Sequence, residues 1–202
     1  MSTGLAAAAC YFRQGTGIAM LERFIEDCIA ARAEADPQAA VTEVLARAVS
    51  NPSAVLAALG EPAKAELNVI HRSPTLTIFA ATWTPRMNVM PHNHLMWVSI
   101  GIYTGREDNI LWKRGSGGRI GSCGAKALFE KDVVALPADA IHSVTNPLSR
   151  FTGGIHVYGG DFFARPRSQW DAETLEETPA DGATMSAFFE NENERYRAGR
   201  PV

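Results

Sequence analysis

The sequence predicts a mainly β protein in which N-terminal helices pack outside an antiparallel barrel or sandwich. Residues 1–70 carry apolar side chains at helical spacing, which is typical of short amphipathic helices. From Leu76 onward the segments are short, β-branched and aromatic, and Gly, Pro and Asn separate them. The 202 residues, 46% of them hydrophobic, are enough for one structural domain. We therefore expect a helical segment over 1–70, a barrel over 71–164 and an extension over 165–202, all within that domain.

Three short helices are expected before the barrel, over the apolar stripes Ile18–Ile29, Val41–Val49 and Val55–Leu59. Asp36-Pro37 and Asn51-Pro52 each combine an N-cap residue with a proline at the first helical position. Gly60 is typical of a helix end. These helices contain no pattern that indicates chemistry.

Seven strands are expected, over Leu76–Thr84, Met90–Tyr103, Asn109–Lys113, Ala125–Glu130, Val133–Leu136, His142–Asn146 and Phe151–Tyr158. Gly115-Ser116-Gly117-Gly118 predicts a flexible turn, and Ala183–Tyr196 predicts a terminal helix. Short strands at close spacing favour an antiparallel barrel or sandwich.

Composition excludes several classes of partner. The net charge of −3 and the pI near 6.0, with no basic stripe, indicate neither nucleic acid nor a membrane surface. Three widely spaced cysteines without a C-x-x-C pair fit a reducing compartment. The run Leu5–Cys10 lacks the basic region of an export signal. We therefore expect a cytoplasmic protein with a small-molecule substrate.

The strongest functional signal is His92-x-His94 followed by His142. Side chains two apart on a strand point to the same face, so His92 and His94 can chelate one ion. Any one of these histidines alone would indicate a core or surface residue. The three together predict a metal site that keeps open positions, which is a catalytic arrangement.

These residues resemble the two sequence motifs of the cupin superfamily. The matching positions are His92, His94 and Gly105 in the first motif and Pro137, His142 and Asn146 in the second. The chain departs from the motifs at Met87, Lys131 and Asp139, where cupins have glycine. The resemblance implies a double-stranded β-helix (jelly-roll) barrel with the helices packed outside it.

The motif's glutamate is missing, because Val98 stands where cupins place that ligand. On one continuous strand, residues 92, 94, 96 and 98 share a face, so Val98 would point toward the metal without binding it. At the alternative spacing the position is Ser99, an implausible ligand. Glu107 lies beyond the Gly105 turn and is not expected to be a ligand. The predicted set is therefore His92, His94 and His142, three neutral groups.

A three-histidine site resembles that of cysteine dioxygenase-like thiol dioxygenases. His94–Trp97, Gly101–Asn109 and Gly154–Tyr158 resemble runs of bacterial members, with Gly154 where the family has serine, and the likeness covers roughly residues 65–190. The resemblance implies an Fe(II) oxidoreductase that adds dioxygen to a thiol to give a sulfinate, although Ni or Zn could occupy the purified protein. His156 would orient the hydroxyl of Tyr158, its neighbour on the same strand face.

The substrate side of this resemblance is weaker. Family members hold the substrate carboxylate with Arg or Gln on a strand before H-x-H, but Ala65–His71 contains no Arg and only the amide of Asn68. Arg72 and Arg86 are the nearest replacements in the sequence. Met96 and Val98, on the expected metal face, would contact the substrate.

Two other functions stay open. One is a metal-dependent cupin acting on a small molecule that is not a thiol. The other is a non-catalytic metal- or ligand-binding cupin. The sequence fits a monomer or a homodimer and does not choose between them.

Overall fold

The computed structural model describes residues 3–116 and 119–199, with side chains from Gly17 onward. Three helices come first: α1 (Thr3–Ala31), α2 (Pro37–Val49) and α3 (Pro52–Leu59). Both expected caps are confirmed, since the Asp36 side chain accepts from Ala39 N at 3.1 Å and the Asn51 side chain from Ala54 N at 3.3 Å. Gly117 and Gly118 of the expected turn lie outside the described residues.

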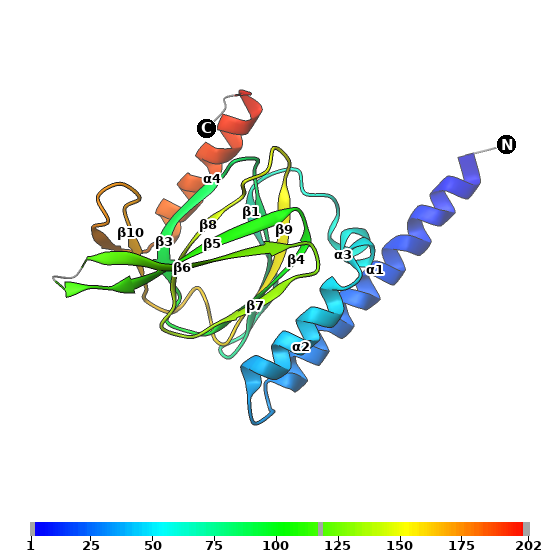
Figure 1. Cartoon of the computed structure of the whole chain (residues 1–202). Coiled ribbons are helices and arrows are strands. Elements are labelled where there is room, and N and C mark those ends of the chain that lie inside the picture. Colours follow the sequence, from blue (N-terminus) through cyan, green and yellow to red (C-terminus); the bar gives the residue numbers. More distant parts are fainter. Residues whose placement is uncertain (1–2, 117–118, 200–202) are drawn as a thin grey trace.

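Two antiparallel sheets form the body of the molecule (Figure 1). The five-stranded sheet has the order β1 (Glu66–Arg72), β2 (Thr77–Trp83), β9 (Thr152–Tyr158), β4 (Val98–Thr104) and β7 (Val133–Leu136). The six-stranded sheet has the order β11 (Glu177–Pro179), β10 (Ser168–Trp170), β3 (Asn88–Asn93), β8 (Ile141–Thr145), β5 (Arg106–Arg114) and β6 (Ile120–Phe129). The sheets enclose an apolar core, and the predicted double-stranded β-helix is confirmed.

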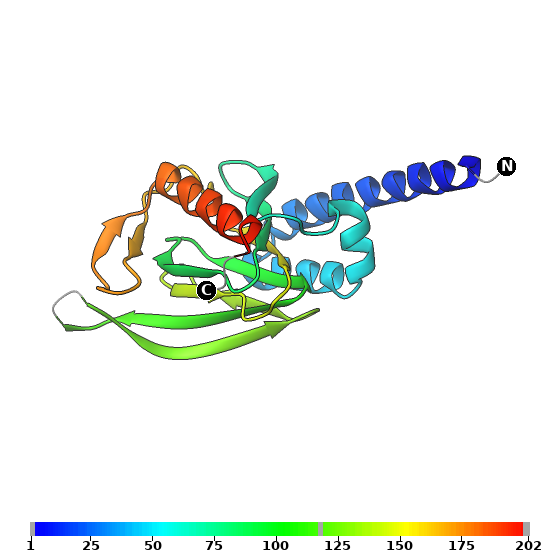
Figure 2. The same cartoon turned by 90° about the horizontal axis from the view of Figure 1, so that it is seen from above.

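Helices α1 to α3 lie together beside the five-stranded sheet (Figures 1 and 2). Leu45 and Val49 of α2 pack toward β4, where a Cβ at Gly101 would lie only 2.9 Å from Leu45 Cγ. Gly101 therefore permits the close approach of the helix to the strand. Ser99 also faces α2, and its Oγ lies 2.7 Å from Thr42 Oγ1.

The final helix, α4 (Gly182–Arg197), lies apart from the other three (Figure 1). Its Asn193 side chain bonds both the N–H and the C=O of Ala65, at 2.7 and 2.9 Å. Its Phe189 stacks on Trp83 with ring centroids 5.9 Å apart. The helix is thus fastened to the start of β1 and to the barrel interior.

Three differences from the expected elements bear on the site. The single strand expected over Met90–Tyr103 is wrong, because Leu95 adopts a φ of +53° and the chain turns between β3 and β4. The helical segment ends at Leu59, and β1 occupies part of the range expected to be helical. The C-terminal extension contributes β10 to the six-stranded sheet, where Gln169 pairs with His92. In the described part of the chain, no helix is long and apolar enough to cross a membrane.

Candidate metal centre

Three histidines converge inside the barrel. His92 is on β3, His94 follows that strand directly, and His142 is on β8, paired in register with His92. Each offers one ring nitrogen, and these nitrogens all lie within 4.8 Å of one another. The Nε2 atoms of His94 and His142 are 2.9 Å apart. The structure therefore brings together the three ligands that the sequence predicts.

Hydrogen bonds orient two of these rings. His92 Nδ1 lies 2.9 Å from the Met90 carbonyl oxygen, and His142 Nδ1 lies 2.6 Å from Asn109 Oδ1. Both oxygens only accept, so each Nδ1 carries the proton and each Nε2 presents a lone pair. This arrangement, in which the outer nitrogen donates and the inner one is free, is the usual one for metal-binding histidines.

The three imidazoles are neutral at neutral pH. Burial lowers the pKa of His92 to about 4 and lowers the pKa values of His94 and His142 well below their usual range. Only the neutral imidazole can bind a metal. The burial that keeps these rings uncharged therefore also prepares them as ligands.

The cluster fits a divalent first-row metal ion. Two nitrogens that each bind one ion at about 2.1 Å and at a right angle are about 3 Å apart, close to the 2.9 Å between His94 Nε2 and His142 Nε2. His94 Nδ1 is buried and has no hydrogen-bond partner among the described residues. Within the same residues no carboxylate joins the cluster, so the ligand set is three neutral nitrogens.

Val98 faces the barrel interior, as expected, but for a different reason. The turn at Leu95 interrupts the alternation from His94, so parity along one strand does not apply. Instead, Val98 on β4 pairs directly with Tyr158 on β9, and paired residues share a face. Val98 and Met96 are buried in the core, and neither lines the cavity beside the histidines.

Tyr158 and His156 lie beside this cluster on β9. The ring of Tyr158 contacts that of His94 edge-on, with centroids 4.8 Å apart. Its hydroxyl is 3.3 Å from His156 Nδ1, which is long for a hydrogen bond. Burial raises the pKa of Tyr158, so the phenol keeps its proton. Both residues line the same cavity as the metal ligands.

Glu107 is a buried residue that the sequence reasoning placed outside the site. Its side chain is fully buried inside the barrel, where Oε1 accepts from Asn109 Nδ2 at 2.9 Å and Oε2 from Trp83 Nε1 at 2.8 Å. Burial alone would raise the pKa of Glu107, but the nearby His156 and these two hydrogen bonds outweigh it and lower the pKa. The carboxylate is therefore ionised. Glu107 and Asn109 are two apart, and this spacing was the available sign that they share a face.

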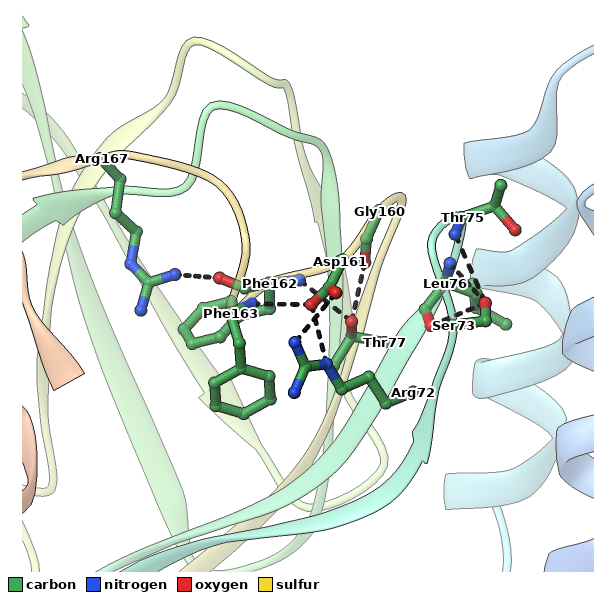
Figure 3. Close-up of polar contacts among 10 residues, drawn as sticks. All are labelled: Arg72, Ser73, Thr75, Leu76, Thr77, Gly160, Asp161, Phe162, Phe163 and Arg167. Atoms are coloured by element: carbon green, nitrogen blue, oxygen red, sulfur yellow. Dashed lines mark hydrogen bonds and ion pairs between the residues drawn. The ribbon is translucent and has the colours of Figure 1, made fainter.

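The structure does not bring Arg72 and Arg86 to the cavity. Arg72 Nε and Nη2 donate to the two carboxylate oxygens of Asp161, both at 3.0 Å, and Arg86 Nη1 donates to the Pro147 carbonyl (Figure 3 for Arg72). Neither arginine is among the residues that line the cavity. Arg72 instead fastens the segment that follows β9.

Thr77 holds the same segment from β2. Its hydroxyl donates to the Gly160 carbonyl at 2.7 Å and accepts from Phe162 N at 3.1 Å (Figure 3). Together with the Arg72–Asp161 pair, these bonds place the Phe162 ring against the cavity, 5.7 Å from the ring of His94.

Arg167 is the arginine that reaches the site. Its Nη1 donates to the Phe162 carbonyl, and its guanidinium lies over the Phe162 ring, 3.7 Å from the centroid (Figure 3 for the first contact). No carboxylate among the described residues pairs with it. Partial burial lowers the pKa of Arg167, but a guanidinium stays charged. A single arginine in a polar C-terminal loop carries no sequence signal for this role.

The cavity at the histidines is small and mostly apolar. Its volume is about 40 Å³, and it is lined by Leu67, Phe79, Trp83, Val89, His92, His94, His142, Val144, His156, Tyr158, Phe162, Arg167, Ala180, Met185 and Phe189. A hollow of about 830 Å³ adjoins it beneath α4 and shares Leu67, Phe162, Arg167, Met185 and Phe189. The two cavities therefore adjoin at these five residues, and Arg167 lies between them.

Comparison with known proteins finds solved structures that are similar at low sequence identity. No family model matches the chain. Similar solved structures include an RmlC-like cupin family protein from Methanocaldococcus jannaschii, with 12% identity over 51% of this chain and 86% of that one and a TM-score of 0.43. A double-stranded β-helix protein from Klebsiella pneumoniae shows 11% identity over 60% and 90% of the two chains, with a TM-score of 0.40. The Bacillus subtilis oxalate decarboxylase, a protein with Mn(II) centres, shows 17% identity over 46% and 23%, with a TM-score of 0.37. At these identities and TM-scores the comparisons assign no chemistry to this chain, which is argued from its own residues.

Proposed function

We propose that the protein is a mononuclear non-heme iron oxidoreductase that adds dioxygen to the sulfur of a small thiol. The observation that supports this most directly is the set of three neutral imidazoles without a carboxylate. An anionic thiolate balances one of the two positive charges of a divalent ion in such a set. Its soft sulfur donor also favours Fe(II) over harder ions. A ferrous ion held by His92, His94 and His142 would supply the one-electron chemistry that lets dioxygen react with a thiol.

The reaction balances without a further reductant. A thiol R–SH and dioxygen give the sulfinic acid R–SO₂H, so both oxygen atoms are reduced and end on the sulfur. The sulfur loses four electrons. No cofactor other than the metal is therefore required.

Arg167 supports a substrate that carries a carboxylate as well as a thiol. Its guanidinium is half-buried, is fixed over Phe162 and has no acidic partner among the described residues. A carboxylate is the group that a guanidinium binds best, through two parallel hydrogen bonds. The apolar walls, among them Phe79 and Phe189, suit a short carbon chain between the two groups.

Tyr158 supplies a proton at the wall of the cavity. Its hydroxyl is only loosely held by His156 Nδ1, at 3.3 Å, so the hydrogen can turn toward an anion in the cavity. We expect Tyr158→Phe to keep its metal and to lower kcat about a hundredfold, within the range of general acid–base effects. Tyr103→Phe is the matched control, because Tyr103 is buried among the helices away from the cavity. Equal rates for the two variants would remove Tyr158 from the mechanism.

Dioxygen uptake by the iron-loaded protein tests the proposal. Cysteine, mercaptopropionate and mercaptoethanol would be compared under anaerobic loading and timed exposure to dioxygen, with iron content and sulfinate measured on the same samples. We expect one sulfinate formed for each dioxygen consumed, and a preference for the two carboxylated thiols.

Two results would contradict this expectation. A protein that holds one ferrous ion and consumes no dioxygen with any thiol would be a metal-dependent cupin with a non-thiol substrate. A folded protein that binds no divalent ion would be a non-catalytic cupin.

A further inference from the structure

A chain of buried polar contacts begins at a metal ligand. His142 Nδ1 donates to Asn109 Oδ1 at 2.6 Å, and Asn109 Nδ2 donates to Glu107 Oε1 at 2.9 Å. The amide of Asn109 can be oriented in only one way here, because the carboxylate of Glu107 must accept from Nδ2, which leaves Oδ1 toward His142 Nδ1. The carboxylate of Glu107 is thus one residue removed from the metal ligand.

The chain continues on the other side of Glu107. Its Oε2 accepts from Trp83 Nε1 at 2.8 Å and lies 3.4 Å from His156 Nε2. That contact is at ion-pair distance, and His156 Nε2 makes no aligned hydrogen bond. An acceptor at this place favours a proton on His156 Nε2, which leaves Nδ1 facing the Tyr158 hydroxyl.

We propose that Glu107 is a positioning residue of the metal centre, whose buried carboxylate supplies from outside the ligand set the negative charge that the three imidazoles lack. Through Asn109 it holds the ring of His142, and its contact with His156 Nε2 leaves Nδ1 of that ring toward the Tyr158 hydroxyl. This inference rests on the proposed function only in requiring that the three histidines hold a divalent ion.

Counting charges in the barrel interior shows what this carboxylate does. The imidazoles are neutral, so a divalent ion alone would leave two uncompensated positive charges in an apolar cavity, which is strongly unfavourable. With His156 in the neutral form that carries its proton on Nε2, Glu107 cancels one of these charges, and a thiolate would cancel the other. Arg167 and a substrate carboxylate would form a second neutral pair. The site is therefore balanced for a substrate with two negative charges.

Neighbouring residues give a matched pair of variants. Glu107→Gln removes the inner charge while preserving size. Asp108→Asn removes the same charge one residue along β5, where Asp108 faces outward and pairs with Arg106 at 2.7 Å. Affinities for Co(II) and, under anaerobic conditions, Cu(I) would be measured by competition with a chromogenic chelator, and folding by circular dichroism.

We expect Glu107→Gln to weaken Co(II) binding about 10- to 100-fold, as is usual for partners of metal ligands, and Asp108→Asn to leave it unchanged. Coulomb energy scales with the charge of the ion, so the loss of binding free energy should be about half as large for Cu(I) as for Co(II). The affinity for Cu(I) should therefore fall only by about the square root of the factor found for Co(II). A purely structural role of Glu107 would weaken both ions equally. Glu107→Met, an apolar residue of similar length, replaces the glutamine variant if that variant does not fold.

The failures are distinguishable. Wild-type Co(II) affinity in a folded Glu107→Gln protein, or equal losses for Co(II) and Cu(I), would overturn the role of Glu107 and leave the metal centre intact. A folded wild-type protein that binds neither ion would overturn the proposed function, and the role of Glu107 with it.

Discussion

His142→Ala will abolish metal binding while the barrel stays folded. His142 is one of the three proposed ligands, and its Nδ1 also joins the cluster to Asn109 and Glu107. Changes to residues that merely support a ligand cost about 10- to 100-fold in affinity, so loss of the ligand should exceed a hundredfold. Metal content per chain after dialysis, and Co(II) affinity by chelator competition, will measure the loss. His92→Ala and His94→Ala should behave in the same way.

His71→Ala is the control for these variants. His71 lies on β1, outside the cluster and outside the cavity lining, so its removal should leave metal content at the wild-type value. Full metal content in folded His142→Ala would show that the ligand set is assigned wrongly. Equal loss in His71→Ala would indicate a general effect on folding instead.

Arg167→Met will raise KM for a carboxylated thiol about 30-fold and leave KM for mercaptoethanol unchanged. Methionine keeps an apolar side chain beside Phe162 but removes the guanidinium that lies over that ring and its donors. A hydrogen-bonded contact to a charged group contributes about 2 kcal/mol, which corresponds to a factor of about 30. Steady-state dioxygen uptake with mercaptopropionate and mercaptoethanol gives both constants.

Arg165→Met provides the matched control, since Arg165 is an exposed arginine in the same loop, away from the cavity lining. Its kinetics should equal those of the wild type. If Arg167→Met affected both thiols alike, Arg167 would shape the cavity without recognising a carboxylate. If it affected neither, the substrate would bind elsewhere.

The sequence was sufficient for the fold class and for the three histidines because both depend on short-range patterns. Cap residues such as Asp36 act within one helical turn, and their effect can be inferred locally. The cluster could be anticipated because His92 and His94 are neighbours in the sequence and His142 belongs to a second local motif. Such local patterns can be recognised without knowledge of tertiary contacts.

The break at Leu95 could not be predicted in the same way. A leucine with positive φ is unusual, and its side chain gives no signal for that conformation. Parity would relate His94 to Val98 only if one strand contained both, whereas the inward orientation of Val98 comes from its pairing with Tyr158. Register between distant strands decides the face, and one sequence does not contain that register.

Glu107 and Arg167 were missed for a related reason. A glutamate in a charged strand and an arginine in a polar loop normally face solvent. Only the closure of the barrel buries Glu107, and only the bonds that fix Phe162 bring Arg167 to the cavity. Their roles depend on contacts between segments far apart in the chain.

The histidine cluster and part of the cavity wall come from different elements of the chain, because α4 is attached to the barrel from outside. The histidines come from β3, its following turn and β8, whereas Met185 and Phe189 of the terminal helix form part of the cavity wall. Substitutions on one face of that helix can therefore alter the cavity wall without changing His92, His94 and His142. Under the proposed function, related proteins could differ in substrate through changes in this one helix while they keep the same three histidines.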